Sequence, residues 1–217
     1  MNRPNIPTWL AAYEEIRTDS YAMLAALLTQ APSEDLLKIL EKLEWETSLP
    51  RSLDAALAEL CRAGRNRTPG ELEDEYNRLF VGLGRGELMP YASWYREGKI
   101  QSMPLVFLRS SLRRLGIVKQ ADSAEPEDHV GALCEVMTLL SAEPDEPSHA
   151  EQMEFFRQHI APWMPAFFGD LQAAKNAGFY RAVARFGDSL LETESEYFKY
   201  GTEHPSAARE GGRQDED

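Results

Sequence analysis

Apolar residues recur every three to four positions along most of the chain, and this spacing constrains the fold more than any other feature. The first clear stripe consists of Trp9, Tyr13, Ile16, Met23 and Leu27. Side chains at this spacing share one face of an α-helix, whereas a half-buried strand needs strict alternation. No convincing alternating run occurs, so we expect an all-α protein that forms a single compact helical domain of about nine to ten helices.

Signals for helix ends lie between these periodic segments. Ser33 precedes an acidic turn, and Thr68–Glu71 has the residues of a capping box with proline at the first helical position. The helical spacing continues to about residue 200, and no apolar period remains beyond it. We therefore expect a domain over residues 1–200 and a disordered acidic tail over residues 201–217.

The chain is strongly acidic, with 23 Lys and Arg against 36 Asp and Glu and a net charge of −13. Such a protein repels nucleic acid and attracts cationic partners. The longest apolar stretch near the N-terminus, Tyr21–Leu28, is far shorter than the ~20 residues of a membrane span, and no secretory leader is visible. We expect no membrane span, no nucleic-acid partner, and Cys61 and Cys134 as buried thiols of a cytoplasmic protein.

Residue patterns typical of catalytic or metal sites are sparse. The four histidines form no HxxxH pair, which a helical metal site commonly uses. Gly82–Gly86 has the glycines of a phosphate loop but lacks its Gly-Lys-Ser/Thr ending and a preceding strand. The acidic run Glu73–Glu75 is typical of a solvated helix face. We therefore expect no enzyme, no metal and no cofactor, and a nucleotide hydrolase that uses the glycine loop is the catalytic alternative.

Two segments carry a more specific signal. The first is Glu75–Gly82 (Glu-Tyr-Asn-Arg-Leu-Phe-Val-Gly), followed by Pro90–Ser93 (Pro-Tyr-Ala-Ser) and Tyr95. The second is Glu125–His129, an acidic stretch that ends in Asp-His. Together and in this order they resemble the signature of the TorD/DmsD/NarJ chaperones. The sequence departs from that signature at Leu83, where the family commonly has proline.

The resemblance implies an all-helical cytoplasmic protein that assists the maturation of molybdenum oxidoreductases of the dimethyl-sulfoxide-reductase type. Its partners would be the twin-arginine signal peptide and the apo form of such an enzyme, and the sequence does not name which enzyme. Holding the peptide would delay export until the cofactor is inserted. A related alternative is a NarJ-like factor that binds the N-terminus of a non-exported catalytic subunit. A monomer and a domain-swapped dimer both stay open.

A peptide with two arginines and a following apolar segment requires an apolar groove beside an anionic rim. Tyr91, Trp94 and Tyr95 fall in a predicted loop and offer large apolar surfaces that lose little entropy on binding. Leu79 and Phe80 would form the floor of the groove, or would serve only in the core. Under the resemblance, the residues predicted to bind the peptide are Tyr76, Leu79, Phe80, Gly82, Pro90, Tyr91, Ser93, Trp94, Tyr95, Glu125, Asp128 and His129.

Three of these polar residues have alternative roles that the sequence leaves open. Asp128 lies where a helix is expected to begin, so it would cap that helix or pair with a peptide guanidinium. His129 would lie near both the positive end of the helix dipole and the neighbouring acids. The sequence leaves open which of the two determines the charge of the ring. Ser93 would cap a helix or bond the peptide backbone.

Overall fold

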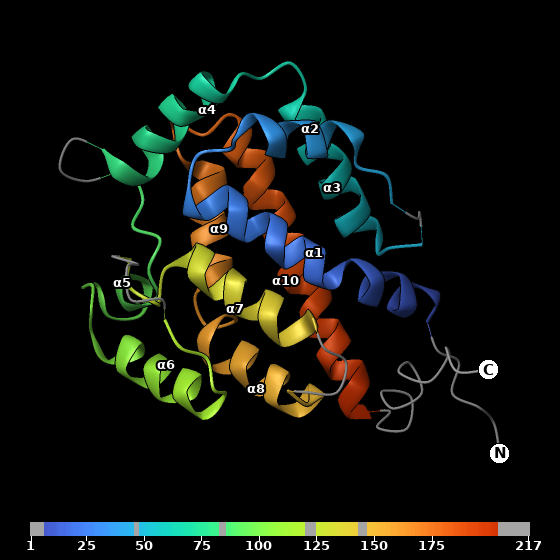
Figure 1. Ribbon diagram of the computed structural model, residues 1–217, viewed down its shortest axis with the longest axis vertical. Helices are drawn as coiled ribbons and strands as arrows, with labels where there is room; N and C mark the ends of the chain where they lie inside the picture. The colour runs from blue at the N-terminus through green and yellow to red at the C-terminus, as the bar shows by residue number, and fades with distance from the viewer. Residues whose placement is uncertain (1–6, 46–47, 83–85, 120–124, 143–146, 204–217) are drawn as a thin grey trace.

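Helices form along the whole described chain, as the apolar spacing predicts (Figure 1). The computed structural model describes residues 7–45, 48–82, 86–119, 125–142 and 147–203. In chain order the elements are α1 (Thr8–Thr29), α2 (Glu34–Lys42), α3 (Arg51–Gly64), α4 (Pro69–Tyr76), the π-helix η1 (Asn77–Val81), α5 (Ala92–Glu97), α6 (Met103–Arg114), α7 (Val130–Ala142), α8 (His149–His159), α9 (Met164–Ala173) and α10 (Phe179–Glu203). No strand occurs among these residues, and the all-α prediction is confirmed.

The predicted helix caps form as expected. The Ser33 hydroxyl accepts a hydrogen bond from the Leu36 N–H at 3.2 Å, at the start of α2. Thr68 and Glu71 satisfy each other's backbone N–H groups in a full capping box before α4. At the other end of the chain, α10 continues to Glu203, so the helix passes the boundary predicted at residue 200. The rest of the predicted tail lies outside the described residues.

The centre of the molecule is built on α1, α7, α9 and α10. Figure 1 shows α1 crossing in front of α10, with α7 beside α1. Large aromatic side chains, such as those of Phe168 and Phe186, are fully buried here, and each contributes roughly 1.5–3 kcal/mol by leaving water. Cys61 and Cys134 are buried and free, as predicted.

A buried ion pair joins the first helix to the last. The Arg17 guanidinium on α1 donates to both carboxylate oxygens of Glu194 on α10, over 2.7–3.1 Å. Arg17 also donates to the Gln152 side chain of α8 at 2.7 Å, and the Tyr13 hydroxyl donates to Glu194 at 2.5 Å. Arg17 and Glu194 are 5% and 0% exposed, so this cluster ties three helices together inside the protein.

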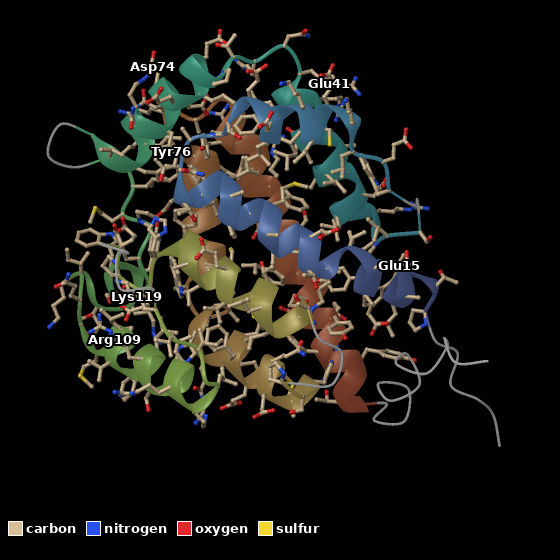
Figure 2. The ribbon with its side chains drawn as sticks, in the orientation of Figure 1. Glu15, Glu41, Asp74, Tyr76, Arg109 and Lys119 are labelled. Carbon is tan, nitrogen blue, oxygen red and sulfur yellow. The ribbon has the colours of Figure 1, made fainter. Side chains whose placement is uncertain are left out.

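The longest helices, α1 and α10, have 22 and 25 residues. Both carry exposed charged side chains, such as Glu15 on α1 (Figure 2) and Arg185 on α10. Within the described ranges, no helix combines the length and the apolar content that a membrane crossing requires.

Candidate functional site

The first motif lies on a helix that changes its winding. At Tyr76, α4 passes directly into η1, and the Gly82 N–H donates to the Asn77 carbonyl at 2.7 Å, which is the five-residue step of a π-helix. Gly82 has a φ of 61°, a value that L side chains rarely adopt. Gly82 therefore ends η1 through its backbone. Leu83, where the sequence departs from the family signature, lies outside the described residues.

Four ring side chains form a continuous row, which we call the aromatic row: Tyr76, Phe80, Phe167 and Tyr95. Successive ring centroids lie 5.0, 6.4 and 6.0 Å apart, within the range of favourable aromatic pairs. Phe167 is fully buried, whereas the other three are only partly buried. Leu79 is also fully buried, so it supports the row from the core rather than from the surface.

The predicted loop after Tyr91 is in fact the short helix α5, so the loop prediction is wrong for Ser93, Trp94 and Tyr95. Six residues are too few to produce a recognisable apolar period. Trp94 and Tyr95 are half-buried, and the Tyr95 hydroxyl donates to Asp170 at 2.9 Å.

A short backbone bridge brings the two sequence motifs together. Tyr91 and His129 pair in antiparallel orientation as an isolated β-bridge. The Ala92 N–H donates to the Asp128 carbonyl at 2.9 Å, and the Val130 N–H donates to the Pro90 carbonyl at 2.8 Å. The Tyr91 and His129 rings pack edge to face, with their centroids 5.3 Å apart. Pro90 is buried at this junction, so the start of α5 and the start of α7 are fixed to each other.

Asp128 caps a helix, but not the one that the sequence suggested. Its carboxylate accepts from the Ser93 N–H at 2.9 Å and from the Ser93 hydroxyl, so it caps α5 instead of α7. Asp128 is 1% exposed and Ser93 is 0% exposed. Ser93 therefore holds Asp128 in place and is not at the surface. The second carboxylate oxygen, Oδ1, is buried and has no hydrogen-bond partner among the described residues.

His129 takes the capping position of α7. Its Nδ1 accepts from the Gly131 N–H at 3.2 Å, which places the proton of the neutral ring on Nε2. Burial lowers the pKa of His129, while the charges of Glu125 and Asp128 act in the opposite direction. Desolvation dominates over the neighbouring acids, so His129 is neutral near pH 7.

Glu125 and Glu127 form an anionic rim beside Tyr91. The Tyr91 hydroxyl donates to the Glu125 carboxylate. Burial, followed by the charge of Glu125, raises the pKa of Tyr76 to about 12, which relates the rim to the aromatic row. Arg109 of α6 makes two hydrogen bonds of 2.8 Å to the Glu127 carboxylate, and these lower the pKa of Glu127.

Two other carboxylates accept hydrogen bonds from the backbone of the turn before α10. Neither role was predicted from the sequence. Glu75 accepts from the N–H groups of Gly178 and Tyr180 at 2.8 Å each, and it is 8% exposed. Its assignment to a solvated helix face is therefore wrong. Glu87 accepts from the Lys175 N–H at 2.7 Å. Neither partner is near in sequence, so no local pattern could have identified them.

An open cleft of about 460 Å³ lies beside this turn, and Glu75 is part of its lining. Its lining is mostly polar and includes Arg67, Asp74, Arg78 and Lys175. None of the residues predicted to bind the peptide lines it, so this cleft is not the predicted apolar groove. Within the described residues, no three metal-ligating side chains gather closely enough to hold a metal ion.

The structure thus unites most of the predicted site residues around the Tyr91–His129 bridge and the aromatic row. Leu79, Pro90, Ser93 and Asp128 are buried supports, and the remaining predicted residues keep some exposed surface, apart from the buried His129. Phe167, Arg109 and Glu127 are additions from the structure. Phe167 and Arg109 lie outside both motifs and reach the site from α9 and α6, whereas Glu127 lies inside the second motif and was not assigned a binding role.

Comparisons with known proteins agree with this architecture. The family described as "Nitrate reductase delta subunit" matches residues 46–169. Chaperone protein TorD of Shewanella pealeana is 24% identical over 86% of this chain and 91% of its own. Tat proofreading chaperone DmsD of Salmonella typhi is 28% identical over 81% and 89%.

A solved structure of a redox enzyme maturation protein from Archaeoglobus fulgidus has the same fold, with a TM-score of 0.54. It is 19% identical and covers 88% of this chain and 97% of its own. The family match extends over more than half of the sequence and includes both motifs. The chain therefore belongs to the nitrate reductase delta subunit family.

Proposed function

We propose that this protein is a cytoplasmic, non-catalytic chaperone that binds the twin-arginine signal peptide of a molybdenum-dependent oxidoreductase. It holds the peptide, and so delays export until the enzyme has received its cofactor and folded. The names of the relatives, TorD and DmsD, a Tat proofreading chaperone, support this role.

The juxtaposition of an anionic rim and an aromatic row carries the proposal. Glu125 and Glu127 offer carboxylates to a guanidinium, and charge-assisted pairs of this kind are short and strong. Tyr76, Phe80 and Tyr95 offer partly exposed apolar surface to the segment that follows the arginines. Each apolar side chain buried there contributes roughly 1.5–3 kcal/mol. A few such contacts reach micromolar affinity, which corresponds to ~8 kcal/mol.

Calorimetry with a synthetic peptide tests the proposal. The peptide carries two adjacent arginines followed by an apolar helical segment, and a second peptide carries two alanines instead. We expect the second peptide to bind roughly tenfold to a hundredfold more weakly, because it loses the charge-assisted hydrogen bonds. Binding should also weaken as salt rises and yet persist, because salt screens only the charged part.

Substitution of an aromatic residue tests the apolar part. We expect Trp94→Ala to weaken peptide binding while the melting temperature stays close to that of the parent protein. Ile39→Ala is the matched control, because Ile39 is 55% exposed on α2, far from the site in the sequence. Equal loss of affinity in both variants would remove Trp94 from the proposed site.

The family description favours one related alternative, a factor that assembles a non-exported enzyme subunit. Such a factor would bind an N-terminal segment that lacks paired arginines. Equal affinity for the arginine and alanine peptides would therefore support this alternative over the twin-arginine function.

A further inference from the structure

The Arg109–Glu127 pair has the geometry of ligand recognition. Arg109 donates from Nε to one carboxylate oxygen and from Nη2 to the other, each at 2.8 Å. This bidentate contact is the geometry in which a carboxylate binds a guanidinium, whether the guanidinium belongs to the same chain or to a peptide. The protein thus displays, on its own surface, the chemical group that its proposed ligand carries twice.

The pair lies within the proposed site. Glu127 directly precedes Asp128, and the Pro126 carbonyl accepts from the His129 N–H at 3.1 Å. A second cation reaches the same stretch, because the Lys119 ammonium donates to the Glu125 carbonyl at 2.6 Å. Figure 2 shows Arg109 and Lys119 on the same side of the view as Tyr76. The rim is therefore partly neutralised by cations from α6 and the turn that follows it.

An independent observation indicates unused binding capacity at this place. Asp128 is 1% exposed, and its Oδ1 has no hydrogen-bond partner among the described residues. Buried carboxylate oxygens are normally satisfied, so one without a partner is a marker of a group that the free protein lacks. Of these two neighbouring residues, Glu127 has its carboxylate paired with an internal guanidinium, and Asp128 has one buried oxygen without a hydrogen-bond partner among the described residues.

Breaking the Arg109–Glu127 pair costs the protein little free energy, so another guanidinium can replace Arg109. The Arg109 side chain is 50% exposed and that of Glu127 is 15% exposed, so water reaches the contact. Exposed ion pairs contribute little to folding stability. A peptide arginine and Arg109 cannot both use the two oxygens of Glu127 in this geometry, and two guanidinium groups at one carboxylate repel each other.

We propose that Glu127 is a guanidinium-binding subsite for the signal peptide and that Arg109 occupies this subsite until a peptide arginine replaces it. The inference rests on the proposed function, because the replacing group is one of the two peptide arginines. Arg109 then lowers the apparent affinity and favours a ligand that brings a guanidinium of its own. A peptide with only apolar character gains nothing from the exchange.

The test measures the affinity of the synthetic twin-arginine peptide for four proteins: the parent chain, Arg109→Gln, Arg113→Gln and Glu127→Gln. Arg113 is the matched control, because it lies one turn further along α6, is exposed and makes no side-chain ion pair with the described residues. Both arginine variants remove one positive charge from the same helix, so they change the long-range field similarly. Melting temperatures verify that each variant folds.

We expect Arg109→Gln to bind the peptide about two- to sixfold more tightly than the parent, because an exposed pair blocks the subsite only part of the time. Arg113→Gln should show a smaller gain, and Glu127→Gln should bind more weakly than the parent. If Arg109→Gln binds no more tightly than Arg113→Gln while the parent chain binds the peptide, the subsite inference is overturned and the proposed function stands. If the parent does not bind the peptide at all, both are overturned.

A second measurement follows Arg109 directly. The side-chain Nε–H signal of Arg109 in a ¹H–¹⁵N spectrum is identified by its absence in Arg109→Gln. We expect it to shift when the twin-arginine peptide is added and to stay in place with the alanine peptide. A signal unchanged at saturating twin-arginine peptide would show that Arg109 remains on Glu127, and would overturn the exchange.

Discussion

Two of the arginine–glutamate pairs in this protein differ strongly in their exposure to solvent. In the Arg17–Glu194 pair the side chains are 6% and 0% exposed, whereas in the Arg109–Glu127 pair they are 50% and 15% exposed. Their closest N–O distances are nearly equal, at 2.7 and 2.8 Å. The same chemical contact therefore occurs both where water is excluded and where water competes.

The difference in burial separates structure from function. Tyr13 donates to Glu194, and Gln152 and the ring of Tyr197 contact Arg17, with the ring centroid 4.9 Å from the guanidinium carbon. No ligand reaches such a pair, and a missing partner would leave a charge without water. Arg109 is exposed on α6, where water reaches its contact with Glu127. A short bidentate contact alone does not indicate which of these roles an arginine has.

The largest effect is expected when the buried pair is broken. Arg17→Leu leaves Glu194 charged and uncompensated in the core, which should cost about 3–5 kcal/mol of unfolding free energy. Urea denaturation measures this loss. The double variant Arg17→Leu with Glu194→Leu should recover part of the stability, because it removes the stranded charge. A single variant that loses less than about 1 kcal/mol would contradict the structural role of this pair.

A smaller effect is expected at the cap of α5. Asp128→Ala removes the acceptor of two hydrogen bonds from Ser93 and should cost about 1–3 kcal/mol. Hydrogen exchange should show faster opening of the α5 amides. Ser93→Ala keeps the bond from its backbone N–H to Asp128 and loses the two bonds of its hydroxyl, to Asp128 and from the Ser102 N–H at 3.4 Å, so it should cost less. Equal exchange rates in Asp128→Ala and the parent chain would show that α5 does not depend on this cap.

The pH dependence of the unfolding free energy tests the contribution of the buried histidines. Burial, followed by the charges of Arg96 and Arg114, lowers the pKa of His159 to about 4, against about 6.5 in the unfolded chain. Between these values the unfolded chain binds more protons. Stability is therefore complete above pH 6.5 and falls as pH decreases toward 4. At pH 5 the loss from His159 should be on the order of 1 kcal/mol.

Urea unfolding at pH 7.5 and pH 5 measures this dependence in the parent chain and in His159→Gln. His129 and His149 have lowered pKa values too, so the variant should lose only part of the pH effect. Identical pH dependence in the two proteins would show that His159 does not contribute.

The smallest effect on stability is expected at the exposed pair. Glu127→Gln should change the unfolding free energy by less than about 1 kcal/mol, because water and salt already screen the contact. The same urea series measures it. A loss comparable with that of Arg17→Leu would mean that the exposed pair is also structural, and the contrast between the two regions would disappear.

The sequence predicted the helices well because their signals are local. Apolar spacing and capping residues such as Ser33 and Thr68 act over one or two turns, and the structure confirms them. The sequence failed at α5 because its cap comes from Asp128, 35 positions along the chain. Glu75 was misjudged for the same reason, since its partners at the start of α10 lie more than a hundred positions away.

The site was predicted in part for a similar reason. The two motifs named Tyr91 and His129, and the structure places them in contact. Their binding of a peptide remains a prediction. The motifs could not reveal that Arg109 pairs with Glu127, because Arg109 lies outside both motifs, 18 positions before Glu127. Nor could they reveal that burial dominates the pKa of His129, since desolvation depends on the complete fold.

The link between the first and last helices also has a consequence for biosynthesis. Arg17 and Glu194 lie 177 positions apart in the sequence, and closing so long a loop is slow. The contact between α1 and α10 therefore closes only after the chain has been synthesised as far as Glu194.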